Sequence, residues 1–159
     1  MINELIRMAR LFEGYEEEAD GSTIFGKMYD LKEKTKDVYR KAEWCMMGIE
    51  YCARACGISP ALIPHTASCP QLLQYGEDHY MMRKRPKVGD ICLFKFNAAD
   101  KASHVGIVTA VSEGGDEFLT FEFNRKHTTG TMRPWAHEDR HTKTNSPEVV
   151  GFYRWEEEG

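Results

Sequence analysis

The spacing of the apolar residues changes part-way along this chain, and the change restricts the folds available to it. Apolar residues recur at helical spacing over residues 2–12 and again over residues 42–55. After the basic run at residues 83–87 they form alternating or short continuous runs rich in Val, Ile and Phe, which are typical of strands. Helices followed by strands predict an α+β fold, with N-terminal helices packed on a central antiparallel sheet of about four to six strands.

The same pattern predicts the individual elements and one domain. Strands are expected over residues 90–96, 104–111, 117–124 and 148–155. Gly114 and Gly115 supply the turn of a hairpin, and a short helix is expected at residues 71–75. Residues 20–41 are interpreted as a loop with at most a short helix, and residues 125–147 as a long polar connection. The 159 residues are enough for one core, so we expect a single domain, helical over about 1–57 and sheet over about 88–155.

Composition excludes several classes of protein. No stretch has the roughly 18 consecutive apolar residues of a membrane span, and Glu4 and Arg7 interrupt the start of the chain, so neither a span nor a signal peptide is expected. The formal net charge of -4 argues against general attraction to nucleic acid, although local basic patches stay open. The five cysteines cannot all pair, and Cys52 and Cys56 have no matching Cys/His pair for zinc. We expect a monomer with a free thiol and no cofactor.

Three segments carry side chains that can act together on a substrate. Cys45 opens the second predicted helix, where free N–H groups and the helix dipole favour a thiolate and can hold an oxyanion. His104 opens a strand and can serve as its base, while Glu122 and Asn124 end the next strand and can orient the imidazole. The other five histidines, expected on the surface or in loops, are His65, His79, His127, His137 and His141.

This arrangement depends on the register of the predicted hairpin. A loop of two or four residues centred between Gly114 and Gly115 would turn the His104 side chain away from the polar face of the neighbouring strand. A three-residue loop over residues 113–115, or one bulge, would bring His104 opposite Asn124 and place Gly106 opposite Glu122. We predict the second register, in which Gly106 leaves room for the carboxylate to reach the imidazole.

Several short stretches together are similar to one known family. They are Glu43-Trp44-Cys45, Cys56-Gly57-Ile58, Pro86 to Asp90 leading into Ile91 to Phe96, Ser103 to Val108, Thr120 to Asn124, and Val150 to Arg154. In this order they resemble the CHAP domains, cysteine- and histidine-dependent amidohydrolases/peptidases that cut bacterial peptidoglycan. The resemblance runs from about residue 42 to residue 154.

The resemblance implies a papain-like fold, related to that of the NlpC-type wall peptidases, and a role for each residue. Cys45 would be the nucleophile, His104 the general base and then acid, Glu122 the group that orients His104, and Asn124 an accessory polar residue. Glu122 favours the CHAP branch, because the NlpC-like enzymes usually place another histidine third. Some CHAP domains bind calcium in an Asp-rich loop, but Asp20-Gly21-Ser22 lacks repeated acidic ligands, so no metal is expected.

The implied function is peptidoglycan hydrolysis, as an N-acetylmuramoyl-L-alanine amidase or a stem or cross-bridge endopeptidase. The chain would be a phage-type lysin made in the host cytoplasm, or a secreted catalytic module trimmed of its signal. Trp44 and Trp135 are candidates for lining the substrate cleft, although packed aromatic rings are more common. Residues 125–147, with five basic and two acidic side chains, could meet an anionic wall polymer or be simply solvated. A thiol hydrolase of non-wall peptides or isopeptides, and a non-catalytic binding module, stay open as alternatives.

Overall fold

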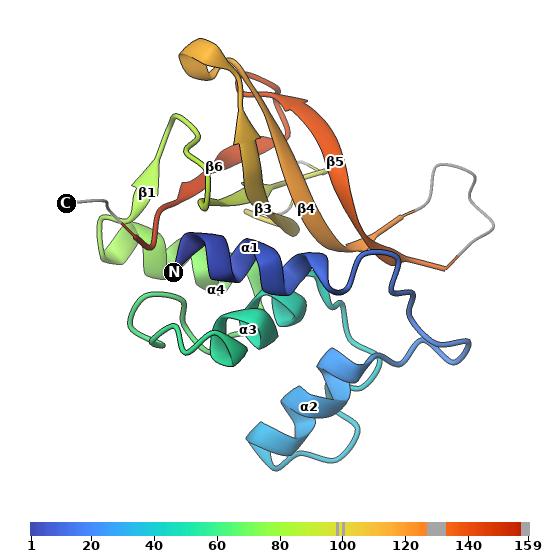
Figure 1. Ribbon diagram of the computed structural model, residues 1–159. Coiled ribbons are helices and arrows are strands. Elements are labelled where there is room, and N and C mark those ends of the chain that lie inside the picture. Colours follow the sequence, from blue (N-terminus) through green and yellow to red (C-terminus); the bar gives the residue numbers. More distant parts are fainter. Residues whose placement is uncertain (98, 100, 127–132, 157–159) are drawn as a thin grey trace.

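A computed structural model of the protein describes residues 1–97, 99, 101–126 and 133–156 (Figure 1). Its helices are α1 (Ile2–Arg10), α2 (Ile24–Glu33), α3 (Cys45–Ala55) and α4 (Cys69–Asp78). Its strands are β1 (Met82–Arg83), β2 (Ile91–Phe94), β3 (His104–Val111), β4 (Glu117–Arg125), β5 (Trp135–Lys143) and β6 (Val149–Tyr153), and a short 3-10 turn, Glu113–Gly115, joins β3 to β4. The predicted α+β fold is confirmed, with the N-terminal helices and the antiparallel sheet that the papain-like resemblance implies.

Two helices, α2 and α4, are longer than the spacing of apolar residues predicts, and capping residues explain where they begin. Thr23 begins α2, where its hydroxyl accepts a hydrogen bond from the Gly26 N–H. Ser68 begins α4 in the same way through the N–H of Gln71, and Pro70 occupies the first turn, where no backbone donor is needed. Helix α2 therefore fills part of a stretch expected to be mainly loop, and α4 is longer than the helix expected at residues 71–75.

The strands form one six-stranded sheet in the order β1-β6-β2-β3-β4-β5 with antiparallel neighbours, among the described residues. The expectation of a polar connection over residues 125–147 is wrong, because β5 lies within it and pairs with β4. This strand forms one edge of the sheet, and of its described side chains only Ala136 and Thr142 are buried, so its sequence is polar enough to resemble a loop.

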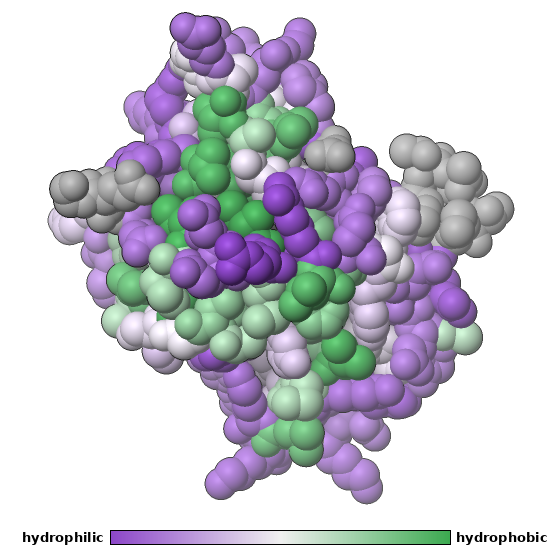
Figure 2. Space-filling model, in the orientation of Figure 1, coloured by the Kyte–Doolittle hydropathy of each residue, from purple (hydrophilic) through white to green (hydrophobic). Residues whose placement is uncertain are grey.

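The helices gather on one side of the sheet, with α1 across its base (Figure 1). The main core lies between the helices and the sheet and includes Leu5, Ile49, Ile107 and Phe121. On the other side of the sheet is a smaller cluster of Cys92, Phe94, Val108, Phe118 and Phe152. The alternation of side chains along each strand produces both clusters, because neighbouring residues such as Ile107 and Val108 point to opposite faces. Hydrophilic residues occupy most of the outline in Figure 2, and hydrophobic ones collect towards its middle.

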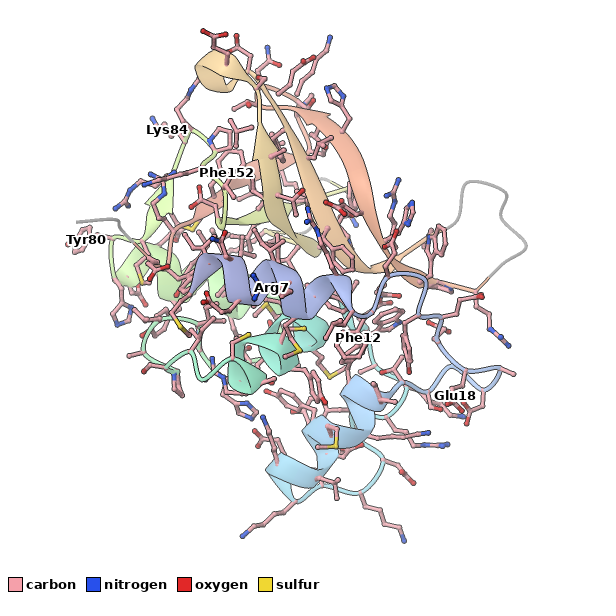
Figure 3. All side chains as sticks on the ribbon, in the orientation of Figure 1. Arg7, Phe12, Glu18, Tyr80, Lys84 and Phe152 are labelled. Carbon is pink, nitrogen blue, oxygen red and sulfur yellow. The ribbon has the colours of Figure 1, made fainter. Side chains whose placement is uncertain are left out.

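Helix α3 packs against other helices as well as against the sheet. It contacts α1, α2, β3 and β4, and six of its residues belong to the main core. At Gly48 a Cβ atom would lie 2.3 Å from Cγ of Phe123, so only glycine allows α3 this close to β4. Phe12 leaves the end of α1 towards the same region (Figure 3), and its ring packs edge-on against Phe25 and Tyr51. The start of α3 is thus fixed by packing from several elements.

Candidate active site

Cys45 is the first residue of α3, as the sequence predicts. No side chain caps this helix, and Trp44 in the N-cap position makes no capping hydrogen bond. The first N–H groups of a helix have no partner within it, so they and the helix dipole favour a negative charge at this point. The thiol is 3% exposed and lies inside the edge of the core rather than in a surface loop.

His104 and Glu122 form a buried pair on the neighbouring strands. His104 is the first residue of β3, and its Nε2 lies 2.7 Å from Oε1 of Glu122, which has no exposed surface. The other carboxylate oxygen accepts a hydrogen bond of 2.6 Å from the Thr120 hydroxyl, and Nη1 of Arg140 lies 3.5 Å from Oε1. Both carboxylate oxygens are therefore held by neighbouring side chains, and the position of the carboxylate orients the ring of His104.

The predicted register is confirmed, and it arises by the bulge. The turn is a four-residue loop, residues 113–116, and it pairs Val111 with Phe118. If this register continued along β3, the His104 side chain would point away from the polar face of β4. A register shift between Val108 and Ala110 adds one residue to β3, so that Val108 pairs with Thr120 and Ile107 with Phe121. One step further along this register, Gly106 faces Glu122.

The glycine opposite Glu122 makes room for its side chain. A Cβ atom on Gly106 would lie 2.7 Å from Cγ of Glu122, closer than any side chain tolerates. Because Gly106 has no side chain, the side chain of Glu122 can cross over β3 at this position and reach the imidazole of His104. The bulge and the glycine together place His104 and Glu122 on the same face of the sheet, opposite to the main core.

Sequence reasoning missed Cys69, which lies against the candidate nucleophile. Its Sγ is 3.6 Å from Sγ of Cys45, and both thiols are free and buried. Cys69 is the first residue of α4. The signal that could have found it is the pair Ser68 and Gln71, whose spacing is that of a capping box and marks the start of a helix at Cys69.

The titration of these groups follows from their contacts. The pKa of Cys45 falls to about 5, because the Cys69 thiol, His104 and the Met46 N–H stabilise the thiolate against the effect of burial. Burial lowers the pKa of His104, but hydrogen bonds to Cys45 and Glu122 outweigh it and raise the pKa to about 9. Burial alone would raise the pKa of Glu122, but its contacts with His104 and Arg140 have the larger effect and lower that pKa below its usual value. The site therefore holds a thiolate, an imidazolium and a carboxylate at neutral pH.

The other predicted residues take different positions. Asn124 has a left-handed backbone, with φ of 56°, and its side-chain amide donates to the carboxylate of Glu43. Trp44 is 1% exposed and stacks on Phe25, so the structure places it in the core, and its predicted role in lining a cleft is wrong. Trp135 is half-buried at the start of β5 and stacks on the ring of His137.

The structure describes four of the other five histidines, and each of these four contacts groups other than the thiol. His65 bridges the carboxylates of Glu33 and Glu50, and His79 ends α4. His137 and His141 belong to β5, whereas His127 is outside the described residues. In the described ranges no group of three or more His, Cys, Asp or Glu side chains could hold a metal ion, and no helix has the length and apolar character to cross a membrane.

A hollow of about 500 Å³ adjoins the buried pair on the outer side of the sheet. Its lining residues are Lys95, Phe96, Asn97, Arg140, Pro147 and Glu148. The Phe96 ring is 54% exposed and lies 5.8 Å from the His104 ring, and the Arg140 guanidinium lies over Phe96 while also reaching Glu122. The hollow and the site thus share two side chains.

Comparison with known families identifies the class to which this geometry belongs. The model of the CHAP domain matches residues 36–124. The chain belongs to the CHAP family. No curated protein and no solved structure matches it. Within the CHAP domain the matched segment contains Cys45, Cys69, His104, Glu122 and Asn124, while β5 and β6 follow it. Family membership makes this CHAP domain a hydrolase of the amidase or peptidase type.

The pH dependence of alkylation tests the charge state of this CHAP domain. Between about pH 5 and 9 the thiolate of Cys45 and the imidazolium of His104 coexist, so iodoacetamide should modify Cys45 at a nearly constant rate from pH 6 to 8. An ordinary thiol, with a pKa of about 8.5, would react roughly a hundredfold faster at the upper end of this range. Mass spectrometry of the modified peptides measures the rate, and the half-buried Cys56, whose pKa burial raises, is the internal control. A steep rise at Cys45 would contradict the ion pair.

Proposed function

We propose that this CHAP domain is a peptidoglycan hydrolase that cleaves an amide bond with Cys45 as its nucleophile. One observation supports the proposal most: His104 lowers the pKa of the Cys45 thiol, while its Nε2 lies 2.7 Å from the fully buried carboxylate of Glu122. A nucleophile, a base and a group that orients the base are the parts that covalent acyl transfer requires. The CHAP family supplies the reaction class, and these side chains can supply its steps.

The contacts support a role for each group in the first half of the proposed reaction. Because Nε2 of His104 is paired with Glu122, Nδ1 is the ring nitrogen that serves the Cys45 sulfur. The thiolate attacks the amide carbonyl, and the oxygen of the tetrahedral intermediate can be held by the backbone N–H of Cys45 at the helix start. His104 then gives its proton to the leaving amine, the C–N bond breaks and a thioester remains.

In the second half, the neutral imidazole accepts a proton from water as the water attacks the thioester. The C–S bond breaks, the carboxylic acid leaves, and the thiolate–imidazolium pair is restored. Glu122 stays ionised throughout and stabilises the imidazolium each time it forms. The exposed face of Phe96 beside His104 offers an apolar surface along which the substrate chain can lie.

Wall polymer contains two kinds of amide that fit this chemistry. One joins muramic acid to the first alanine of the stem, and the other kind lies within the stem or the cross-bridge. We propose that the domain acts on one of them as a monomer, either as a phage-type lysin made in the host cytoplasm or as a module secreted to the wall.

The products of purified peptidoglycan test this proposal. For each amide bond cut, we expect one new free amine on one fragment, one new carboxylic acid on the other, a combined mass larger by one water, and no new reducing sugar ends. Mass spectrometry identifies which amide has been cut, and protein treated with iodoacetamide is the control and should leave the polymer intact. Intact polymer after incubation with untreated protein, together with cleavage of a non-wall peptide or isopeptide, would contradict the proposal and favour a thiol hydrolase of another substrate.

A further inference from the structure

We infer that Cys69 is a positioning residue of the proposed active site, whose S–H donates a hydrogen bond to the Cys45 sulfur and holds it for attack. The inference rests on the proposed function, because it concerns the same nucleophile. The two sulfur atoms are 3.6 Å apart, within the range of a hydrogen bond between sulfur atoms. Neither thiol is in a disulfide, and Cys69 is only 5% exposed, so it faces the nucleophile rather than solvent.

The positions of the two thiols decide which one keeps its proton. Two buried sulfur atoms in contact cannot both be ionised, because the two charges would repel each other in a medium of low dielectric constant. Cys45 also contacts the imidazole of His104, whereas no such contact is described for Cys69. The charge therefore settles on Cys45, and Cys69 stays protonated as the donor. The pKa of Cys69 is raised accordingly by Cys45 and by burial.

The donor comes from a rigid element. Cys69 begins α4, whose N-terminus is fixed by the hydroxyl of Ser68 and by Pro70. Leu72 and Leu73 of the same helix are buried in the main core. The backbone that carries Cys69 is therefore held in place. Its S–H can restrict the rotation of the Cys45 side chain about the Cα–Cβ bond. This contact adds a donor to those supplied by His104 and the start of α3.

Loss of the donor should change the pH dependence of the nucleophile. In Cys69→Ala the pKa of Cys45 should rise, so that less thiolate is present at low pH. We expect the midpoint of iodoacetamide modification at Cys45 to move upward by about one pH unit or more, which is a tenfold loss of rate below the midpoint. The value of kcat should fall more at pH 6 than at pH 8, while KM stays the same, because Cys69 is buried and does not meet the substrate.

Three further variants make the test specific. Cys69→Ser keeps a donor of smaller size and should lie between wild type and Cys69→Ala. Cys69→Val fills the space of the thiol without a donor, and it gives the same comparison if the alanine variant is unstable. Cys56→Ala removes a thiol at the other end of α3 and should leave the midpoint where it is. If the Ala and Val variants melt at lower temperature but keep the wild-type midpoint, Cys69 only fills space and the inference is wrong.

This measurement is independent of the wall substrate. Iodoacetamide reports the charge on Cys45 whether or not peptidoglycan is cleaved. A shifted midpoint in a protein that leaves peptidoglycan intact would therefore refute the proposed substrate and support the role of Cys69. An unshifted midpoint in a protein that cleaves peptidoglycan would support the proposed function and refute the role of Cys69.

Discussion

Cys45→Ala should lower the rate of peptidoglycan hydrolysis by at least about a thousandfold, because Cys69, the thiol beside it, has no described contact with His104 and keeps its proton. The fold should persist, since the change removes only one sulfur atom and leaves the other core residues of α3 in place. The loss of turbidity of a cell-wall suspension measures the rate, and a thermal melt of the same preparation verifies the fold.

Cys56→Ala is the matched control for this experiment. Cys56 ends the helix that Cys45 begins, and it is only partly buried, so its replacement should leave hydrolysis almost unchanged. Equal rates for wild type and Cys45→Ala would eliminate the covalent mechanism. If neither protein cleaves the wall and Cys45 is also unreactive towards iodoacetamide at neutral pH, the protein is a non-catalytic binding module on the CHAP fold.

Glu122→Gln should reduce kcat by about a hundredfold or more, because a neutral amide cannot stabilise the imidazolium of His104. The carboxylate helps to raise the pKa of His104 to about 9, so its loss should lower that pKa. The alkaline limb of the pH–rate profile of hydrolysis should then begin at lower pH than in wild type. Glutamine has almost the volume of glutamate, and it can still accept from the Thr120 hydroxyl, so the strand should keep its place.

Glu117→Gln makes the same chemical change on the same strand and is the control. Its carboxylate is partly exposed and lies 3.4 Å from His141, away from the thiol. This variant should keep the wild-type kcat and the wild-type alkaline limb. If Glu122→Gln also kept both, Glu122 would be a buried structural charge, and the assignment of His104 as the base would lose its orienting partner.

The sequence was sufficient to predict the class of fold and the three segments that meet at the site, since periodicity and motif order are local properties. It also predicted the register at His104, because only a displaced register puts the imidazole on the polar face. It did not predict that Thr109 would be the residue at which β3 bulges. A polar edge strand such as β5 has no apolar alternation to mark it, and burial of Trp44 depends on Phe25, which is distant in sequence.

Cys69 was missed for a different reason. A pattern of single residues can show that a helix begins at Cys69, but it cannot show that the starts of α3 and α4 point at each other. That contact depends on the path of residues 56–68 between the two helices. Pairs of this kind, formed by two helix ends from separate parts of the chain, are visible only after the chain has been folded.

The order of the strands has a consequence for where a working protein could be shortened. Strand β6 is the last strand in the chain, yet it lies between β1 and β2 and hydrogen bonds with both. A chain ending at Asn124, the last residue of the family match, would leave one side of β2 unpaired and detach β1 from the sheet. The smallest autonomous folding unit therefore extends at least to Tyr153, well past the segment that holds the chemistry.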